Sequence, residues 1–406
     1  MKINAARFLS GFEALERMTV EPPYTRRAFT PMYQTARDWL RDQMLEAGLS
    51  VRLDAGGNLI GRLEGSATTR ALVSGSHTDT VVGGGRFDGI LGVLAALEVA
   101  HTLRDHDTRL KHALEVVDFL SEEPSDYGAS CVGSRAWAGT LTAAMLEAAN
   151  AAGETLAAAI TRAGGDPRAL GSALRDPSEL AGYVELHIEQ GRVLENAGTD
   201  IGAVTGIVAI ERYNLEFHGR ADHAGTTPMR LRADALVAAS RFVTSLRDAA
   251  RGERELVATV GKLSLHPNNA NVVPGVALLT FEARCLETDR LQSFTARTLE
   301  TARSIAQEEG VTLTLSLVSS AALLHADPSI VDAVRASSTG LTCLELPSGA
   351  GHDAMHIGRL CPAGMIFVPC QDGRSHDPSE YSTPEQLVNG AQVLLETLLR
   401  LDDLLG

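Results

Sequence analysis

Apolar residues along the chain recur at helical spacing in some segments and at strand spacing in others, and the two patterns alternate. A helical repeat over residues 30–47 ends at Gly48. The later segments continue the alternation: strand-like runs over 50–65 and 70–79, an apolar helix over 88–104, a strand over 112–120, Ala-rich helices over 134–180 and a strand over 183–187. Because the strands are almost continuously apolar, this order predicts an α/β fold with a mainly parallel sheet covered on both faces.

The pattern changes near residue 210, where strands begin to alternate strictly between apolar and polar residues. Such strands have one wet face. Their order with the intervening helices is β-α-β-β-α-β, which is typical of a small α+β domain of the split βαβ type. The pattern therefore predicts that residues 211–326 are inserted into one α/β domain made of residues 1–210 and 327–406.

Charge and cysteine content narrow the class of protein. The 36 Lys and Arg residues against 51 Asp and Glu residues give a net charge of −15, which argues against nucleic acid or an anionic membrane as a partner. The five Cys residues form no C-x-x-C pair and indicate reduced thiols in a cytoplasmic protein. Glu13 and Glu16 interrupt the apolar core that a signal peptide needs, and no apolar run is long enough for a membrane helix.

Candidate chemistry lies just after the strands, where open α/β sheets place their sites. The first such segment contains His77, Asp79 and Asp88, with glycines 83–85 allowing the chain to turn back. Asp79 could fix the tautomer of His77 as an outer carboxylate. A phosphate loop is the alternative, but the segment has neither G-K-[ST] nor G-x-G-x-x-G. A structural loop would explain His77 alone but not the whole set.

The second segment places Glu122 and Glu123 together at the end of a buried strand. Two carboxylates leaving a core need compensation. A metal ion bound by one carboxylate, and a metal-bound water hydrogen-bonded to the other, would provide it and would make the second carboxylate a general base. A solvated acidic loop is the ordinary alternative for an isolated pair of this kind.

The third and fourth segments place His187 on a strand and His376 in a loop after an apolar strand. A single His at either position is more often structural than a ligand, but four such segments together favour a metal site. The combined donors suit Zn²⁺, Mn²⁺, Co²⁺ or Ni²⁺. They exceed what one catalytic ion needs, so two ions sharing one carboxylate is the simplest arrangement for His77, Asp88, Glu123, His187 and His376.

Nine motifs in order resemble the amidase, hydantoinase/carbamoylase family, within the wider group of two-metal aminoacylases and carboxypeptidases. The resemblance runs from about residue 30 to the C-terminus. The motifs begin at Gly75 (G-S-H-T-D-T), Phe87 (F-D-G), Glu122 (E-E), Gly133 (G-S-R-A), His187 (H-I-E-Q-G), Ala221 (A-D-H-A-G-T-T-P-M), Asn271 (N-V-V-P-G), Ser348 (S-G-A-G-H-D-A-M) and Ser375 (S-H-D-P-S-E).

This resemblance implies a metallopeptidase-like catalytic domain and a division of the ligands. One ion would be held by His77, Asp88 and His187, the other by Asp88, Glu123 and His376, with Asp88 bridging. Glu122 would be the general base. A His at position 187, where the wider group usually has a carboxylate, implies the branch that acts on N-carbamoyl and ureido compounds.

The resemblance also implies that the inserted domain dimerises and closes as a lid. His223 would then enter the partner subunit's site and stabilise the oxyanion. Substrate would be bound by Gln190, His223, Asn271, Arg284, Gly351 and His352. Plain structural roles remain open for these residues: a helix cap region for His223, a turn for Asn271, a strand-face ion pair with Glu282 or Glu287 for Arg284, and loop positioning for His352.

Two departures from the family pattern concern the pocket. Pro124-Ser-Asp-Tyr-Gly128 replaces the usual Glu-Gly-Ser-Arg-Phe run after the paired Glu residues, and Glu282 stands where Asp is usual. The first departure changes the loop beside the general base, so the pocket there is expected to differ.

The sequence thus predicts a two-metal amidohydrolase that cleaves the linear C–N bond of an N-carbamoyl amino acid or an allantoate-like ureide. Water deprotonated by Glu122 would attack the carbamoyl carbon, and the products would include ammonia and CO₂. The substrate would be a small anion, bound by Arg284. The alternatives are an N-acyl amino acid hydrolase or aminopeptidase-like enzyme of the same superfamily, and a non-catalytic metal-binding scaffold whose inserted domain only oligomerises.

Overall fold

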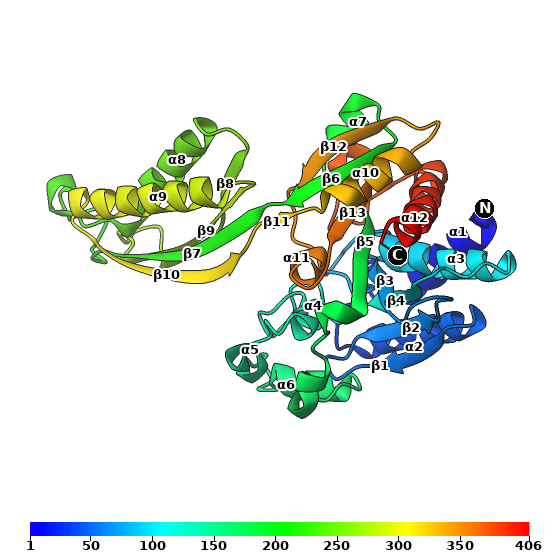
Figure 1. Cartoon of the computed structure of the whole chain (residues 1–406). Coiled ribbons are helices and arrows are strands. Elements are labelled where there is room, and N and C mark those ends of the chain that lie inside the picture. Colours follow the sequence, from blue (N-terminus) through cyan, green and yellow to red (C-terminus); the bar gives the residue numbers. More distant parts are fainter. Residues whose placement is uncertain (406) are drawn as a thin grey trace. The chain divides into compact units, whose positions relative to one another are not determined.

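The structure is a computed structural model that describes residues 1–405. The chain divides into two compact units (Figure 1). The larger unit consists of Met1–Gly206 and the segment beginning at His325, and the smaller unit is Ile207–Leu324. The boundaries expected from the sequence were 211 and 326, a few residues later in each case.

A mixed nine-stranded sheet forms the centre of the larger unit. Its middle strands β4, β3, β5 and β13 run parallel, as expected, whereas β1, β2 and β6 pair antiparallel with their neighbours. Parallel strands end at the same edge, so this order gathers the loops after them. The strand order is β1 (Ser50–Leu53), β2 (Leu59–Leu63), β4 (Ala113–Asp118), β3 (Ala71–Ser76), β5 (Leu180–Ile188), β13 (Ala363–Val368), β6 (Ile201–Ile207) and β11 (Leu324–His325), with β12 (Cys343–Ser348) paired to β6.

Helix α3 (Ile90–Asp105) is the central helix of this unit. Every residue from Ile90 to Leu103 is buried, which accounts for a sequence that is apolar on all sides. The helix packs on β3, β4 and β5 and against α12 (Pro384–Leu404). Three further helices belong to the same core: α1 (Ala5–Glu16), α2 (Pro31–Glu46) and α10 (Pro328–Ser337). Among the described residues, no helix is long and apolar enough to cross a membrane.

The Ala-rich region over 134–180 forms helices, as expected, and all of them are short. Gly139, Gly153 and Gly164 interrupt it with positive φ values of 66°, 82° and 94°, a conformation that ends helices. The segments are α4 (Val132–Trp137), α5 (Ala143–Glu147), α6 (Leu156–Arg162), η1 (Pro167–Ser172) and η2 (Pro177–Glu179), and α7 (Val193–Ala197) follows β5.

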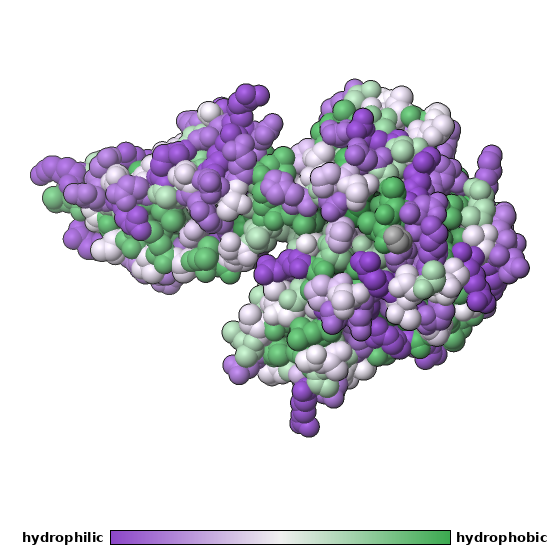
Figure 2. All heavy atoms as spheres, viewed as in Figure 1, coloured by the Kyte–Doolittle hydropathy of each residue, from purple (hydrophilic) through white to green (hydrophobic). Residues whose placement is uncertain are grey.

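The smaller unit is a four-stranded antiparallel sheet with two helices packed against it. Alternate residues of β9 are buried, as the apolar–polar alternation predicted. The apolar sides of the helices form one core with the sheet, while their outward faces are largely hydrophilic (Figure 2). The chain order is β7 (Ala209–His218), α8 (Ala235–Arg251), β8 (Leu256–His266), β9 (Val276–Cys285), α9 (Thr288–Glu308) and β10 (Thr312–Ala321).

One buried ion pair joins α2 to the central sheet. The Nε atom of Arg37 lies 2.9 Å from Oδ2 of Asp118, the last residue of β4, and the two side chains are 3% and 0% exposed. Arg37 also donates to the carbonyl of Gly57. Removing one partner of such a pair leaves the other charge buried without compensation.

We therefore expect Arg37→Ala to lower the free energy of unfolding of the larger unit by about 3–5 kcal/mol. Urea denaturation followed by tryptophan fluorescence measures this directly, because both tryptophans, Trp39 and Trp137, lie in that unit. The matched control is Arg41→Ala on the same helix, where an exposed pair with Asp42 contributes about 0–1 kcal/mol. If the two substitutions lowered the free energy of unfolding equally, the buried Arg37–Asp118 pair would not have the stabilising role inferred for it.

Candidate metal and catalytic site

Three loops and the end of one strand, all at the carboxyl edge of the parallel strands, bring the predicted ligands together. His77 follows β3, Glu122 and Glu123 follow β4, His187 lies near the end of β5, and His376 lies in the loop after β13. The fifth ligand, Asp88, immediately precedes the Gly89 cap of α3. Three groups of side chains have ligand atoms within 4.8 Å of one another. Two of these groups contain Asp88, one with His77 and His187 and the other with Glu123 and His376, and the third consists of Glu185, His187 and His352.

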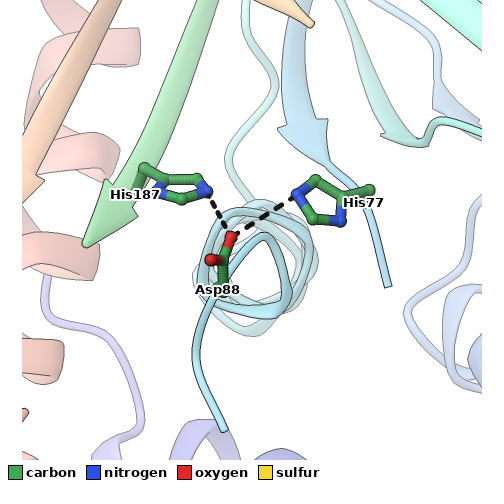
Figure 3. A group of neighbouring side chains, drawn as sticks. All are labelled: His77, Asp88 and His187. Carbon is green, nitrogen blue, oxygen red and sulfur yellow. Dashed lines mark ion pairs between the residues drawn. The ribbon is translucent and has the colours of Figure 1, made fainter. Parts of the chain in front are cut away.

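The carboxylate of Asp88 lies between three imidazoles. Its Oδ1 atom is 3.2 Å from Nε2 of His187 and 3.7 Å from Nε2 of His77 (Figure 3). Its Oδ2 atom is 3.2 Å from Nε2 of His376, which also lies 3.0 Å from Oε1 of Glu123. Only the His376 side chain is substantially exposed, at 47%. The two oxygens of the Asp88 carboxylate thus face two different sets of possible metal-ligand atoms.

The histidine contacts fit a divalent cation. Nδ1 of His77 lies 3.0 Å from the carbonyl of Asp79, and Nδ1 of His187 lies 2.9 Å from the carbonyl of Ile188. Since a carbonyl only accepts, each Nδ1 carries the hydrogen in the neutral ring and each Nε2 presents its lone pair to Asp88. Lone pairs facing a carboxylate oxygen require a cation or a proton between them, and imidazole with carboxylate is a donor set suited to zinc-like ions.

The pKa values of the side chains describe the metal-free form of this cluster. Burial lowers the pKa of His187, but the hydrogen bond to Asp88 together with the charges of Asp88 and Glu185 outweighs burial and raises that pKa to about 9. The N–H of Gly89 donates to the same Nε2 at 3.1 Å and so favours the neutral ring. The opposite effect of the Asp88 charge is larger, so the pKa of His187 is raised. Hydrogen bonds to Asp88 and Glu123 raise the pKa of His376 to about 11, whereas burial lowers that of His77 to about 4.

Asp79 organises the two glutamates through its carboxylate. Its oxygens accept the backbone N–H groups of Glu122 and Glu123 at 3.2 and 3.1 Å. Its carbonyl, rather than the carboxylate suggested by the sequence, makes the hydrogen bond to His77; the carboxylate oxygen is 3.7 Å from Nδ1. Asp79 therefore connects the first and second loops of the site.

Glu122 is buried beside His77, with Oε2 at 3.5 Å from Nε2. Burial first, and then the neighbouring Glu123 carboxylate, raise its pKa well above the usual range, as is common for proton-transferring acids. Its other oxygen, Oε1, accepts a hydrogen bond from the thiol of Cys131 at 3.4 Å. Sequence reasoning missed Cys131, because it belongs to none of the recognisable motifs.

Gln190 lies against the same carboxylate. Its Nε2 atom donates to Oδ2 of Asp88 at 2.7 Å, and it lies 3.2 Å from the hydroxyl of Ser375. Its Oε1 atom is buried without a hydrogen-bond partner among the described residues. The amide therefore has an unused acceptor beside the predicted ligands.

His352 packs on a ligand. The ring centres of His352 and His187 are 4.6 Å apart in an edge-to-face arrangement, and Nε2 of His352 lies 2.8 Å from the hydroxyl of Ser348. The side chain is buried, and neighbouring Gly351 is half-buried. These contacts place His352, which was expected to bind substrate, directly against the predicted ligand His187.

The remaining predicted residues belong to the smaller unit. His223 is exposed, and its Nδ1 accepts the N–H groups of Gly225 and Thr226 at 3.0 and 3.3 Å. The His223 segment pairs with Val272, next to Asn271. Arg284 lies on β9, and its Nε donates to Glu282 at 2.6 Å; the strand-face ion pair considered as an alternative is therefore present.

Known proteins resemble the chain over nearly its whole length. Residues 73–400 match peptidase family M20/M25/M40. An N-carbamoyl-L-amino acid amidohydrolase from Geobacillus stearothermophilus is 42% identical over 380 residues, 93% of each chain. A ureidoglycolate hydrolase from Oryza sativa subsp. japonica is 35% identical over 390 residues, covering 94% of this chain and 81% of its own. The crystal structure of an amidase of the hydantoinase/carbamoylase family from Burkholderia multivorans superposes with a TM-score of 0.87 at 34% identity, covering 98% of both chains.

The raised pKa values predict that metal loading releases protons. At pH 7 the metal-free protein holds a proton on both His187 and His376, since their pKa values are about 9 and 11. A ligand imidazole must be neutral, so binding should displace at least two protons, and affinity should rise as the pH increases from 7 to 9.

Calorimetric titration with Zn²⁺ in two buffers of different ionisation enthalpy counts these protons. His376→Ala should release about one proton fewer than the unaltered protein. A binding enthalpy that does not depend on the buffer would contradict the assignment of His187 and His376 as ligands.

Proposed function

The chain belongs to peptidase family M20/M25/M40, whose members depend on metal ions, and we propose that it hydrolyses an N-carbamoyl-L-amino acid. It is a metal-dependent amidohydrolase acting on the linear C–N bond of ureide-type substrates. The observation that carries the hydrolytic chemistry is the Asp88 carboxylate shared by two groups of candidate metal ligands, with the buried Glu122 beside His77. The 42% identity to an N-carbamoyl-L-amino acid amidohydrolase, against 35% to a ureidoglycolate hydrolase, favours the amino acid substrate.

Two divalent ions are part of the proposal. His77, Asp88 and His187 would hold one, and Asp88, Glu123 and His376 the other, with Asp88 shared. Zn²⁺, Mn²⁺, Co²⁺ and Ni²⁺ all suit these donors. Bound there, the ions would polarise the carbamoyl carbonyl and lower the pKa of water.

Glu122 is the general base in this proposal. Its Oε2 atom faces the ligand cluster, while the thiol of Cys131 contacts Oε1, so the carboxylate is oriented with one oxygen toward the reaction. A raised pKa lets the same group take a proton from water and then deliver it to the leaving nitrogen. The carbamate released would break down to ammonia and CO₂.

His223 would stabilise the oxyanion, reaching the site from a partner subunit in a homodimer formed through the smaller unit. What supports this role is its tautomer. Because Nδ1 accepts two backbone N–H groups, the neutral ring carries its hydrogen on Nε2, which makes Nε2 a donor.

Substrate binding completes the proposal. Arg284 would pair with the substrate carboxylate, and Glu282 orients its guanidinium. The unused Oε1 acceptor of Gln190 suits a carbamoyl N–H. Asn271, Gly351 and His352 would line the remainder of the pocket.

Ammonia release tests the substrate and the base together. With Zn²⁺, Mn²⁺ or Co²⁺ loaded separately, we expect turnover of N-carbamoyl-L-amino acids to exceed that of allantoate, ureidoglycolate and N-acetyl-amino acids. Glu122→Gln should bind metal normally but lose about 10²–10⁴-fold in kcat, the usual contribution of a general base.

The outcomes separate the competing functions. Preference for N-acetyl substrates, measured as release of free amino acid, would favour an N-acyl hydrolase. A metal-loaded protein inert on every amide and ureide would favour the scaffold. Near-normal kcat in Glu122→Gln would remove Glu122 from the proposed role.

Hybrid dimers test the action of His223 across subunits. Glu122→Gln and His223→Ala proteins are each expected to be nearly inactive. After subunit exchange, one site of each hybrid contains both an intact Glu122 and a partner's intact His223, so activity should recover toward one quarter of normal at equal mixing. No recovery, with exchange verified by mass spectrometry of differently tagged subunits, would contradict the proposal.

A further inference from the structure

Glu380 lies beneath the two loops that carry Asp88 and His376. Its side chain is 1% exposed. Oε1 accepts the backbone N–H of Phe87 at 2.8 Å and that of Asp88 at 3.2 Å. A carboxylate from the C-terminal part of the chain thus fixes the main chain at Asp88, almost 300 residues earlier.

The other oxygen of Glu380 contacts its own loop. The hydroxyl of Ser375, next to His376, lies 3.0 Å from Oε2 of Glu380 and 2.6 Å from Oδ2 of Asp88. The two loops are therefore joined twice, through the main chain at Asp88 and through the hydroxyl of Ser375. Glu380 makes the first connection itself and contacts the hydroxyl that makes the second.

Gly85 leaves room for this carboxylate. A Cβ atom built on Gly85 would lie 2.0 Å from Cδ and from Oε2 of Glu380. Gly85 is absent from the residues with positive φ, so its backbone conformation does not itself require glycine. The space occupied by Glu380 is what excludes a side chain there.

We propose that Glu380 is a positioning residue that sets the register of the Asp88 loop against the His376 loop, so that one carboxylate can serve both ions. The inference rests on the two-ion assignment of the proposed function. The oxygens of Asp88 face different imidazoles at 3.2 Å, so a small shift of either loop would break one of the two ligand groups. Groups that orient metal ligands in this way commonly contribute 10–100-fold to metal affinity.

The chain contains a matched control in Asp402. This buried acid also accepts two backbone N–H groups from a distant segment, those of Lys111 and His112 at 2.7 and 2.8 Å. These residues precede β4, so the contact lies at the amino end of a strand whose other end carries Glu122 and Glu123. Loss of Asp402 should destabilise the fold without altering the ligand cluster.

The primary measurement is Zn²⁺ affinity and stoichiometry, obtained by competition with a chromophoric chelator. Glu380→Ala should weaken the binding of both ions by about 10–100-fold, while Asp402→Ala should remain within about threefold of the unaltered protein. Glu380→Gln should also remain within about threefold, because its carbonyl can accept from Phe87 and Asp88 while its amide donates to Ser375.

A substitution at Gly85 provides a second, independent test of the Glu380 contact. Gly85→Ala should displace the Glu380 carboxylate and weaken both ions as Glu380→Ala does. The double variant should be no worse than Glu380→Ala alone, since the two changes act on one contact. In metal-free protein, amide exchange at Phe87 and Asp88 should become faster in Gly85→Ala, which tests the contact even if Glu380→Ala does not fold.

Unchanged affinity in Glu380→Ala, an equal loss in Asp402→Ala, or additive losses in the double variant would each overturn the role of Glu380. These results differ from failure of the proposed function, which would appear as fewer than two ions bound by the unaltered protein.

Discussion

A carboxylate removed from water needs positive charge or hydrogen-bond donors nearby. The groups that meet this need around Asp88 determine most of the larger unit's chemistry. Three imidazoles face its two oxygens. The interaction holds the pKa of Asp88 well below its usual range, although burial alone would raise it. In the metal-free protein we expect protons on His187 and His376, whose pKa values are raised, to supply the positive charge. The same arrangement, with those protons exchanged for cations, becomes the proposed catalytic centre.

The fold meets this constraint by placing the ligands on three loops and one strand end at the same edge of a parallel sheet. Two buried acids then join these loops by accepting hydrogen bonds from main-chain N–H groups. Asp79 holds the segment with Glu122 and Glu123, and Glu380 holds the segment with Asp88. Such contacts restrict the backbone, so the ligands are held in place before an ion binds. Asp79 and Glu380 themselves are not among the proposed ligands.

Much of the site could be predicted from the sequence because its chemistry is local. His77, Asp88 and the Glu122–Glu123 pair follow recognisable strands, and the donor types indicate the metals. The contacts of Cys131 and Glu380 could not be predicted in this way, since each depends on segments brought together only by folding. The Asp79 contact was placed on the right residue but the wrong atom, because strand spacing does not decide between a carbonyl and a carboxylate.

At the level of the fold, the parallel centre and the alternating strands of the smaller unit followed from periodicity. Helices form over 134–180, as the Ala-rich composition predicted, but they are short because Gly139, Gly153 and Gly164 end them locally. The net charge of −15 argues against polyanion partners and also disfavours an anionic substrate at long range. In the proposed function, binding of such a substrate would therefore depend on local cations, namely the proposed ions and Arg284.

Anomalous diffraction at the zinc edge from crystals of the zinc-loaded protein would locate the ions relative to Asp88. We expect two peaks for each copy of the chain, each within coordination distance of a different oxygen of Asp88. The first would also contact His77 and His187, and the second Glu123 and His376. A single peak, or two peaks of which only one touches Asp88, would contradict this expectation.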